Sequence, residues 1–205
     1  MLKNIFIALA TTYSNYPLLT KKLWEEIEKA YSGTKRHYHN QKHLQNMYGE
    51  LLEVKQLTED WDTILFSLFY HDIVYKATAK DNEEKSAVIA IKCLQIIHYP
   101  IEKIVKCRNQ ILSTQHHNTI NDNDTNLLLD ADMAILGSDW HDYEIYYKAV
   151  RKEYTIYPDF LYNPGRAKVL NHFLSMDHIF STGHFREKYE KTARTNLKKE
   201  LEYLI

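Results

Sequence analysis

Cysteine, proline and glycine are scarce in this chain of 205 residues, which contains two, four and five of them. The two cysteines, Cys93 and Cys107, are too few for a disulfide framework or a cysteine-ligated zinc site, so we expect a reducing, cytoplasmic setting. A strong charge of either sign is also missing, because 26 Lys and Arg residues oppose 27 Asp and Glu residues. We therefore expect no nucleic-acid polymer as a partner, while a homo-oligomer stays open.

Long hydrophobic runs are missing as well. The N-terminal stretch 1–17 is apolar for only about ten residues, whereas a membrane span needs roughly 20. This stretch resembles a weak signal peptide, but no small-residue cleavage site follows it cleanly, and Phe6, Leu9 and Ala10 recur at helical spacing. We expect a helix at this end of the chain and no membrane-integral protein.

The pattern of apolar residues predicts an all-α fold. Strict alternation of apolar and polar positions is nowhere sustained, and the few glycines and prolines stand where helices would end. Neither a sequence repeat nor a flexible linker interrupts the chain, so we expect one domain over residues 1–205. Beyond the N-terminal helix, the predicted helical segments are 20–31, 40–57, 60–74, 82–98, 101–115, 124–136, 139–154, 158–176 and 184–203.

The stretch "RHYHNQKHL", residues 36–44, contains three histidines. If a helix begins near Asn40, His39 and His43 share one face, whereas His37 points elsewhere. For this stretch alone, a polar helix start that happens to be rich in histidine is a better interpretation than a ligand site. A metal site therefore depends on partners further along the chain.

Such partners lie on two apolar segments. "WDTILFSLFYHDIVY", residues 61–75, ends in His71 and Asp72, and "NLLLDADMAILG", residues 126–137, contains Asp130 and Asp132. Carboxylates are the residues least expected in such runs, and burying one without a partner costs several kcal/mol. A salt bridge, a hydrogen-bond network or a metal ion would satisfy them.

Four of these groups form a mixed nitrogen and oxygen donor set, consisting of His43, His71, Asp72 and Asp132. Helix bundles build metal sites from facing side chains of this kind. The set suits a divalent ion such as manganese, iron, zinc or magnesium, with nickel and cobalt as further candidates.

The order of these residues resembles the H…HD…D signature of the HD-domain superfamily of metal-dependent phosphohydrolases. More narrowly, six stretches between Arg36 and Leu201 resemble a bacterial subfamily of predicted metal-dependent HD phosphohydrolases: "RHYHNQKH", "FYHDIVYKATAKDNEEKSA", "LLLDADMAILG", "YYKAVRKEY", "GRAKVLNHFL" and "ARTNLKKEL". The resemblance implies an all-α HD bundle, with a core at about residues 36–140 and C-terminal helices packed on it. It also implies a divalent metal and hydrolysis of a small phosphorylated molecule, such as a nucleotide or another phosphomonoester.

Carried over to this sequence, the resemblance makes His43, His71, Asp72 and Asp132 the metal ligands. Asp132 is preferred to Asp130, because the last aspartate of the superfamily commonly follows a small residue and precedes an apolar one. Asp72 would also help to orient the attacking water. For the proton transfer that hydrolysis needs, "DNEEKSA" supplies Glu83 and Glu84, of which we favour Glu83. The alternative, that both glutamates merely stabilise a helix start, is equally well supported.

Several cationic or polar residues are candidates for binding the substrate. We prefer Arg36 and Arg151 to Arg166 and Arg194 as phosphate ligands, because Arg36 precedes the first ligand helix and Arg151 lies on the helix after Asp132. His39 and His117 are further candidates, although a histidine in solvent or at a helix C-terminus explains each nearly as well. We interpret His98, just before "YP", as an end-of-helix residue.

Two other functions stay open. A di-iron HD-type oxygenase would need more histidine ligands between Asp72 and Asp132, and His98, His116 and His117 lie there. A nucleotide-binding regulatory module would keep the ligands without turnover.

Overall fold

The computed structural model describes residues 1–116 and 119–204, and within them it contains ten α-helices and two short 3-10 helices. The all-α prediction is confirmed. The α-helices are α1 Leu2–Thr11, α2 Pro17–Tyr31, α3 Gln41–Glu53, α4 Trp61–Tyr70, α5 Asn82–Ile96, α6 Ile101–Ser113, α7 Asn123–Met133, α8 Trp140–Glu153, α9 Asp159–Ser175 and α10 Gly183–Leu204. The 3-10 helices are η1 Lys55–Leu57 and η2 Ala134–Gly137.

Three predicted helices are too long. The segment 40–57 breaks into α3 and η1, and 124–136 breaks into α7 and η2. The segment 60–74 ends at Tyr70, so the His71 and Asp72 pair lies in the turn that follows α4. Helical periodicity continues through such turns because the side chains after the break still face the core, which is why spacing alone misplaces the ends.

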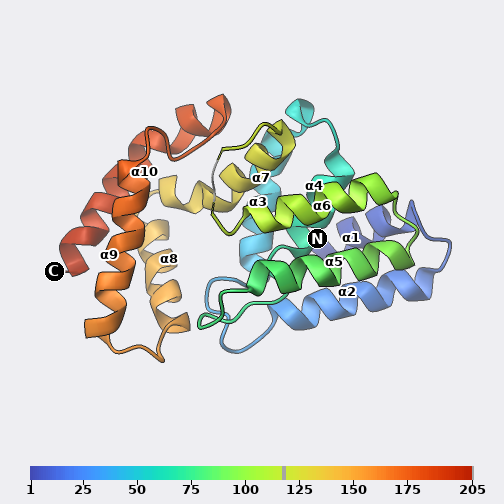
Figure 1. Ribbon diagram of the computed structural model, residues 1–205, viewed down its shortest axis with the longest axis horizontal. Helices are drawn as coiled ribbons and strands as arrows, with labels where there is room; N and C mark the ends of the chain where they lie inside the picture. Colours follow the sequence, from blue (N-terminus) through green and yellow to red (C-terminus); the bar gives the residue numbers. More distant parts are fainter. Residues whose placement is uncertain (117–118, 205) are drawn as a thin grey trace.

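The helices form two groups (Figure 1). The first seven gather into one bundle, and α8, α9 and α10 stand beside it at the C-terminal end. In the centre of the bundle the Phe6 ring of α1 meets the Phe69 ring of α4 edge to face, with 5.2 Å between ring centroids, and Trp24 of α2 packs against both. The predicted N-terminal helix is therefore part of the core.

The two groups meet where α10 packs on η2. A Cβ atom built on Gly137 would lie 2.4 Å from Cβ of Tyr189, so only glycine allows the two backbones to approach this closely. Asn196 donates hydrogen bonds of 2.9 Å to the carbonyl oxygens of Leu136 and Ser138. The C-terminal helices are thus fixed directly behind the end of α7, where Asp132 lies.

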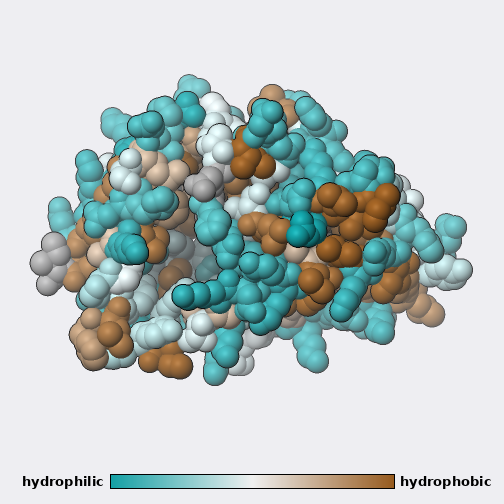
Figure 2. Space-filling view, in the orientation of Figure 1, coloured by the Kyte–Doolittle hydropathy of each residue, from teal (hydrophilic) through white to brown (hydrophobic). Residues whose placement is uncertain are grey.

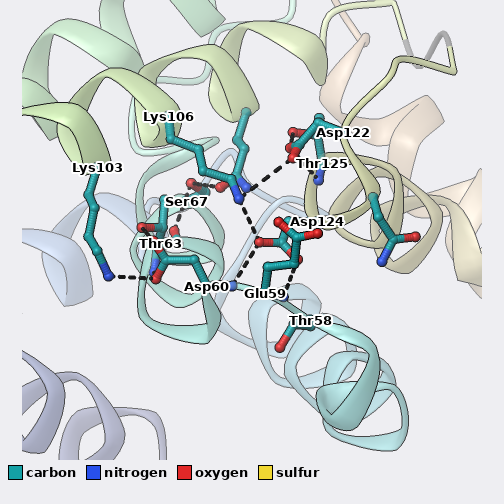
Figure 3. A network of polar contacts seen from close by, with 12 residues as sticks. Thr58, Glu59, Asp60, Thr63, Ser67, Lys103, Lys106, Asp122, Asp124 and Thr125 are labelled. Carbon is teal, nitrogen blue, oxygen red and sulfur yellow. Dashed lines mark hydrogen bonds and ion pairs between the residues drawn. The ribbon is translucent and has the colours of Figure 1, made fainter.

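A buried polar network fixes the start of α4 against α6 and α7 (Figure 3). Asp124 accepts hydrogen bonds from the backbone N–H groups of Glu59 and Asp60 at 2.8 and 2.9 Å, and from Nζ of Lys106 at 2.7 Å. Asp60 caps α4 by accepting from Thr63, and Lys103 donates to the same carboxylate at 3.2 Å. Since α4 ends at the HD pair and α7 ends near Asp132, this network sets the relative position of those residues.

The surface combines charged side chains with apolar areas, the most extended of which lies on the right of the view (Figure 2). Apolar residues gather on the side of the view where α5 and α6 lie in Figure 1. Large exposed apolar side chains on these two helices are Val88, Ile96, Ile101 and Val105. Among the helices of residues 1–116 and 119–204, none combines the length and the apolar character that crossing a bilayer requires.

Candidate metal centre

His43 is supplied by the first turns of α3. Asn40 caps this helix, as the sequence predicts, and its side-chain oxygen accepts a hydrogen bond of 2.9 Å from the backbone N–H of Lys42. The imidazole of His43 is buried and contacts the ring of Tyr38, with 4.9 Å between ring centroids. His37, by contrast, is exposed.

His71 and Asp72 follow the last turn of α4. Nδ1 of His71 lies 2.9 Å from the carbonyl oxygen of Leu68, so the hydrogen on that nitrogen is donated to the backbone. In the neutral form of His71 this bond leaves the lone pair on Nε2, which is the nitrogen that the ring would present to a metal ion. The backbone N–H of Asp72 donates to the hydroxyl of Tyr31 at 3.1 Å, which holds the turn against α2.

These residues meet Asp132 of α7 in one cluster. Nε2 of His43 lies 3.2 Å from Nε2 of His71 and 3.2 Å from Oδ1 of Asp132. One ligand atom from each of these three residues lies within 4.8 Å of the other two. Asp72 borders the cluster, because its Oδ2 is 3.4 Å from Nε2 of His71. The structure thus brings together the predicted ligands, although they come from α3, from the turn after α4 and from α7.

The charges within the cluster act strongly on one another. Burial by itself lowers the pKa of His71, but the carboxylates of Asp72 and Asp132 raise it to about 9. Burial alone would raise the pKa of Asp72, yet the charge and the hydrogen bond of His71 bring it far below its ordinary value. Burial also lowers the pKa of His43 and so favours its neutral form. A protonated His71 therefore supplies a positive charge that offsets the negative charges of Asp72 and Asp132.

The donor chemistry of this cluster fits a divalent cation. Two imidazole nitrogens face each other at 3.2 Å, where at most one proton can stand between them, and carboxylates flank them. A cation would accept lone pairs from both rings at once and would neutralise the carboxylates, which a single proton cannot do. His43, His71 and Asp132 would hold it, with Asp72 adjacent.

Asp130, the alternative ligand, has a different place. Its buried carboxylate accepts hydrogen bonds from the backbone N–H groups of Ser181 and Thr182, at 2.8 and 2.7 Å, and from the Thr182 hydroxyl at 2.6 Å. Asp130 therefore anchors the segment that leads into α10, while Asp132 faces the histidines.

A cavity of about 920 Å³ opens beside the cluster, between the bundle and helices α8 and α9. Asp132 and His39 line it at the end nearest the cluster, and Arg166 and Lys168 line it from α9. Six tyrosines contribute to its wall: Tyr38, Tyr75, Tyr146, Tyr154, Tyr157 and Tyr162. The volume suits a small molecule of nucleotide size.

Neither preferred arginine is available for a phosphate group. Arg36 donates from Nη1 to the carbonyl oxygens of His39 and Asp72, at 3.1 and 2.7 Å, and from Nη2 to that of Ile73 at 3.0 Å. It ties the segment before α3 to the turn after α4. Arg151 binds Asp159 at 2.6 Å and two carbonyl oxygens of the α8–α9 connection, and it does not line the cavity. The arrangement does not support the prediction that these two arginines bind substrate.

Arg166, which we ranked lower, does line the cavity. Its guanidinium forms a bidentate pair with Glu200, at 2.7 and 2.9 Å, and both side chains are at least nine-tenths buried. Nearby, the buried hydroxyl of Tyr162 has no hydrogen-bond partner among the described residues. This end of the cavity therefore carries Arg166, the less preferred arginine, together with Glu200 and Tyr162, neither of which the sequence predicted.

The two glutamates differ in their surroundings. Glu83 is half-buried, and burial together with the negative charge of Asp72 raises its pKa. Glu84 is exposed and lines a separate, smaller pocket with Val88 and Lys85. The surroundings favour Glu83 as the one able to hold a proton near the cluster, and its role stays a prediction.

The remaining histidines are also placed. His39 lines the cavity, and His116 lies at its rim, whereas His117 falls outside the described residues. His98 follows α5 with a φ of 60°, and the N–H groups of His98 and Tyr99 donate back to the carbonyl oxygens of Gln95 and Leu94. This is the Schellman type of helix end, so the prediction for His98 is confirmed.

Sequence reasoning missed Glu153 at the end of α8. Its carboxylate is buried and bonded to His39, although nothing in "RKEY" marks it as part of a site. The available signal was its spacing, because Glu153 follows Tyr146 and Val150 by seven and three residues and so shares their inward helix face.

Comparison of the chain with family models, curated proteins and solved structures finds no match. The resemblance to the HD superfamily accordingly depends on the order of the motifs.

Proposed function

We propose that this chain is a metal-dependent phosphohydrolase acting on a small phosphorylated molecule. The observation that carries the proposal is the cluster of His43, His71 and Asp132 on the edge of the large cavity. Asp132 belongs to both, so a substrate in the cavity would meet the metal site directly. A divalent ion bound there would supply Lewis-acid activation of water and of a phosphoryl oxygen.

The residues of the chain would divide the remaining work. His71 is held in one orientation by its bond to the carbonyl oxygen of Leu68, and His43 by its position on the capped helix α3. Asp72 contributes negative charge 3.4 Å from His71 and would orient the attacking water. Glu83, with a raised pKa, would hold or release the proton that hydrolysis moves.

The cavity favours a small substrate over a polymer. Six tyrosines and Phe173 contribute to its wall, and residues of α8 and α9 line one side of it. The net charge of −1 offers no long-range attraction for a nucleic acid. A single phosphorylated compound, such as a nucleotide or a sugar phosphate, fits these features.

The di-iron oxygenase receives no comparable support. Among the residues that the structure describes, one group of three metal-ligating side chains is present, and His98 is exposed at the end of α5. No observation favours the regulatory module over the enzyme.

The test is a phosphatase screen of the purified chain over nucleotides, sugar phosphates and a chromogenic phosphate. Manganese, magnesium, iron, nickel, cobalt and zinc are supplied in turn to protein freed of metal with a chelator. We expect phosphate release from a subset of compounds, dependent on added metal. Absence of release from every compound with every metal would contradict the proposal.

A further inference from the structure

Glu153 is bonded to both segments that lead to the metal cluster. Its side chain is 1% exposed. Oε1 accepts the backbone N–H groups of Tyr38 and His39 at 2.7 and 3.1 Å, and Oε2 accepts from Nδ1 of His39 at 2.6 Å and from the Tyr75 hydroxyl at 2.9 Å. A carboxylate of α8 thus holds the segment before α3 and the segment after the HD pair.

These bonds fix the imidazole of His39. The bond from Nδ1 to Glu153 determines which nitrogen carries a hydrogen, and the His39 ring stacks on Tyr75 with centroids 4.0 Å apart and planes at 24°. The ring can therefore neither turn nor exchange its two nitrogens without breaking contacts. Among the described residues Nε2 of His39 forms no hydrogen bond, so it is the nitrogen left for a ligand.

The position of His39 indicates which ligand. Its ring lies in the wall of the cavity that Asp132 also lines, and it is 5.9 Å from the ring of His43 between centroids. A group bound between the metal cluster and the cavity would contact Nε2. In a phosphohydrolase that group is the attacking water, because Nε2 carries no hydrogen while Nδ1 donates to Glu153 and can therefore only accept.

We propose that Glu153 is a positioning residue that holds His39 with Nε2 as the hydrogen-bond acceptor for the water that attacks the phosphoryl group of the substrate. The inference rests on the proposed function and adds to it that the C-terminal helices complete the site. A purely structural role for Glu153, clamping the two segments together, makes a different prediction for the two substitutions below.

The first substitution is Glu153→Gln. The amide oxygen can still accept the two backbone N–H groups, but its NH₂ group faces Nδ1 of His39 and can only donate. Nδ1 must then become an acceptor, so the hydrogen moves to Nε2. We expect a long-range ¹H–¹⁵N spectrum of the full chain with labelled histidine to show Nδ1 of His39 protonated in the wild type and unprotonated in E153Q.

The second substitution is His39→Asn. The side-chain amide of asparagine can place an N–H where Nδ1 stands, so the bond to Glu153 and the clamp are kept, while Nε2 is lost. A residue that only clamps would leave turnover nearly unchanged in H39N. We expect instead that H39N and E153Q each lower kcat by about 10- to 100-fold and change KM for the chromogenic phosphate far less.

Glu144→Gln is the matched control, because Glu144 lies on the same helix and pairs with Lys148 near the surface. It should change neither the His39 spectrum nor kcat. Thermal unfolding of each variant shows whether it is folded, and if E153Q is not, H39N decides by itself.

The outcomes are distinct. Turnover by the wild type with a switched spectrum in E153Q and low kcat in H39N supports the inference. If the wild type turns over and the kcat of H39N lies within about twofold of the wild-type kcat, the inference is overturned and the phosphohydrolase proposal stays intact. An unprotonated Nδ1 in the wild type overturns the inference whatever the activity. No turnover by the wild type overturns the proposed function, and the inference with it.

Discussion

Asp124 and Asp132 lie on the same short helix, and their surroundings differ in one respect. Asp124 at the start of α7 is met by two backbone N–H groups and the ammonium of Lys106, all of which donate to it. Asp132 near the end of α7 lies beside His43, whose Nε2 in turn faces Nε2 of His71. The first carboxylate binds two backbone N–H groups and an ammonium, whereas the second lies against an imidazole in a cluster of ligand-type side chains.

This difference separates a structural carboxylate from one suited to a ligand. Buried acceptors that are fully matched by donors stabilise a particular arrangement of helices and need nothing more. Two imidazoles and a carboxylate whose ligand atoms lie within 4.8 Å of one another form a donor set that suits a divalent cation.

The largest effect is expected at the cluster end. Asp132→Asn removes one negative charge from the cluster and keeps the shape of the side chain. We expect phosphate release to fall by about three orders of magnitude or more, because activation of water and of the phosphoryl oxygen requires the bound ion. The thermal midpoint should stay within a few degrees of the wild type. Retained activity in D132N would end the assignment of Asp132 as a ligand.

Glu83→Gln tests proton transfer separately from metal binding. We expect turnover to fall by roughly two to four orders of magnitude, the range for loss of a general acid or base, while metal content stays the same. Glu84→Gln is the matched control, since Glu84 is exposed and lies at the other pocket, and it should retain full activity. If E83Q is as active as E84Q, Glu83 only stabilises the start of α5.

Asp124→Ala should affect stability and not the metal. It leaves two backbone N–H groups without their acceptor and leaves Lys106 with only Asp122, at 3.6 Å, so we expect a loss of about 3 kcal/mol in the free energy of unfolding. Urea unfolding measures the loss, with the exposed Asp177→Ala as a control that should stay within about 0.5 kcal/mol of the wild type. Metal content should be unchanged in the folded variant. Loss of metal from folded D124A would contradict the assignment of Asp124 as a structural carboxylate that is separate from the metal site.

The smallest effect concerns Asp60 in the same network. Burial raises its pKa, but hydrogen bonds from Thr63 and Lys103 outweigh burial and lower it below the ordinary value of 3.8. The unfolded chain therefore binds a proton more readily, and the carboxylate stabilises the fold above pH 3.8, with the gain lost as the pH falls through the lower folded pKa. We expect Asp60→Asn to be less stable than the wild type at pH 7 by about 1 kcal/mol. This difference in the free energy of unfolding should shrink in acid, below the folded pKa of Asp60, and urea unfolding at pH 7 and in acid measures it. An equal difference under both conditions would contradict the account.

The sequence predicted the local parts of the site well. The start of α3 near Asn40 followed from spacing, and the choice of Asp132 instead of Asp130 followed from the resemblance to the HD superfamily. These features depend on contacts within one helix or on the order of motifs. Local rules are sufficient for them.

The parts that failed depend on contacts between distant segments. The guanidinium of Arg36 donates to three carbonyl oxygens of the loops around the site. Glu153 accepts hydrogen bonds from residues more than 100 positions earlier in the chain. The tyrosine-lined cavity exists only once α8 and α9 stand beside the bundle. Spacing within a segment gives the face of a helix but not the partner that this face meets.

The central claim is that His43, His71 and Asp132 hold a divalent cation, and elemental analysis of the full-length chain, purified without a metal-affinity tag, tests it most directly. The account predicts about one equivalent of a transition metal or magnesium per chain after incubation with the ion and desalting. It also predicts that this content is lost in Asp132→Asn and His71→Ala and kept in Asp124→Ala. Metal at background level in the wild type, or equal content in all four proteins, would contradict the account.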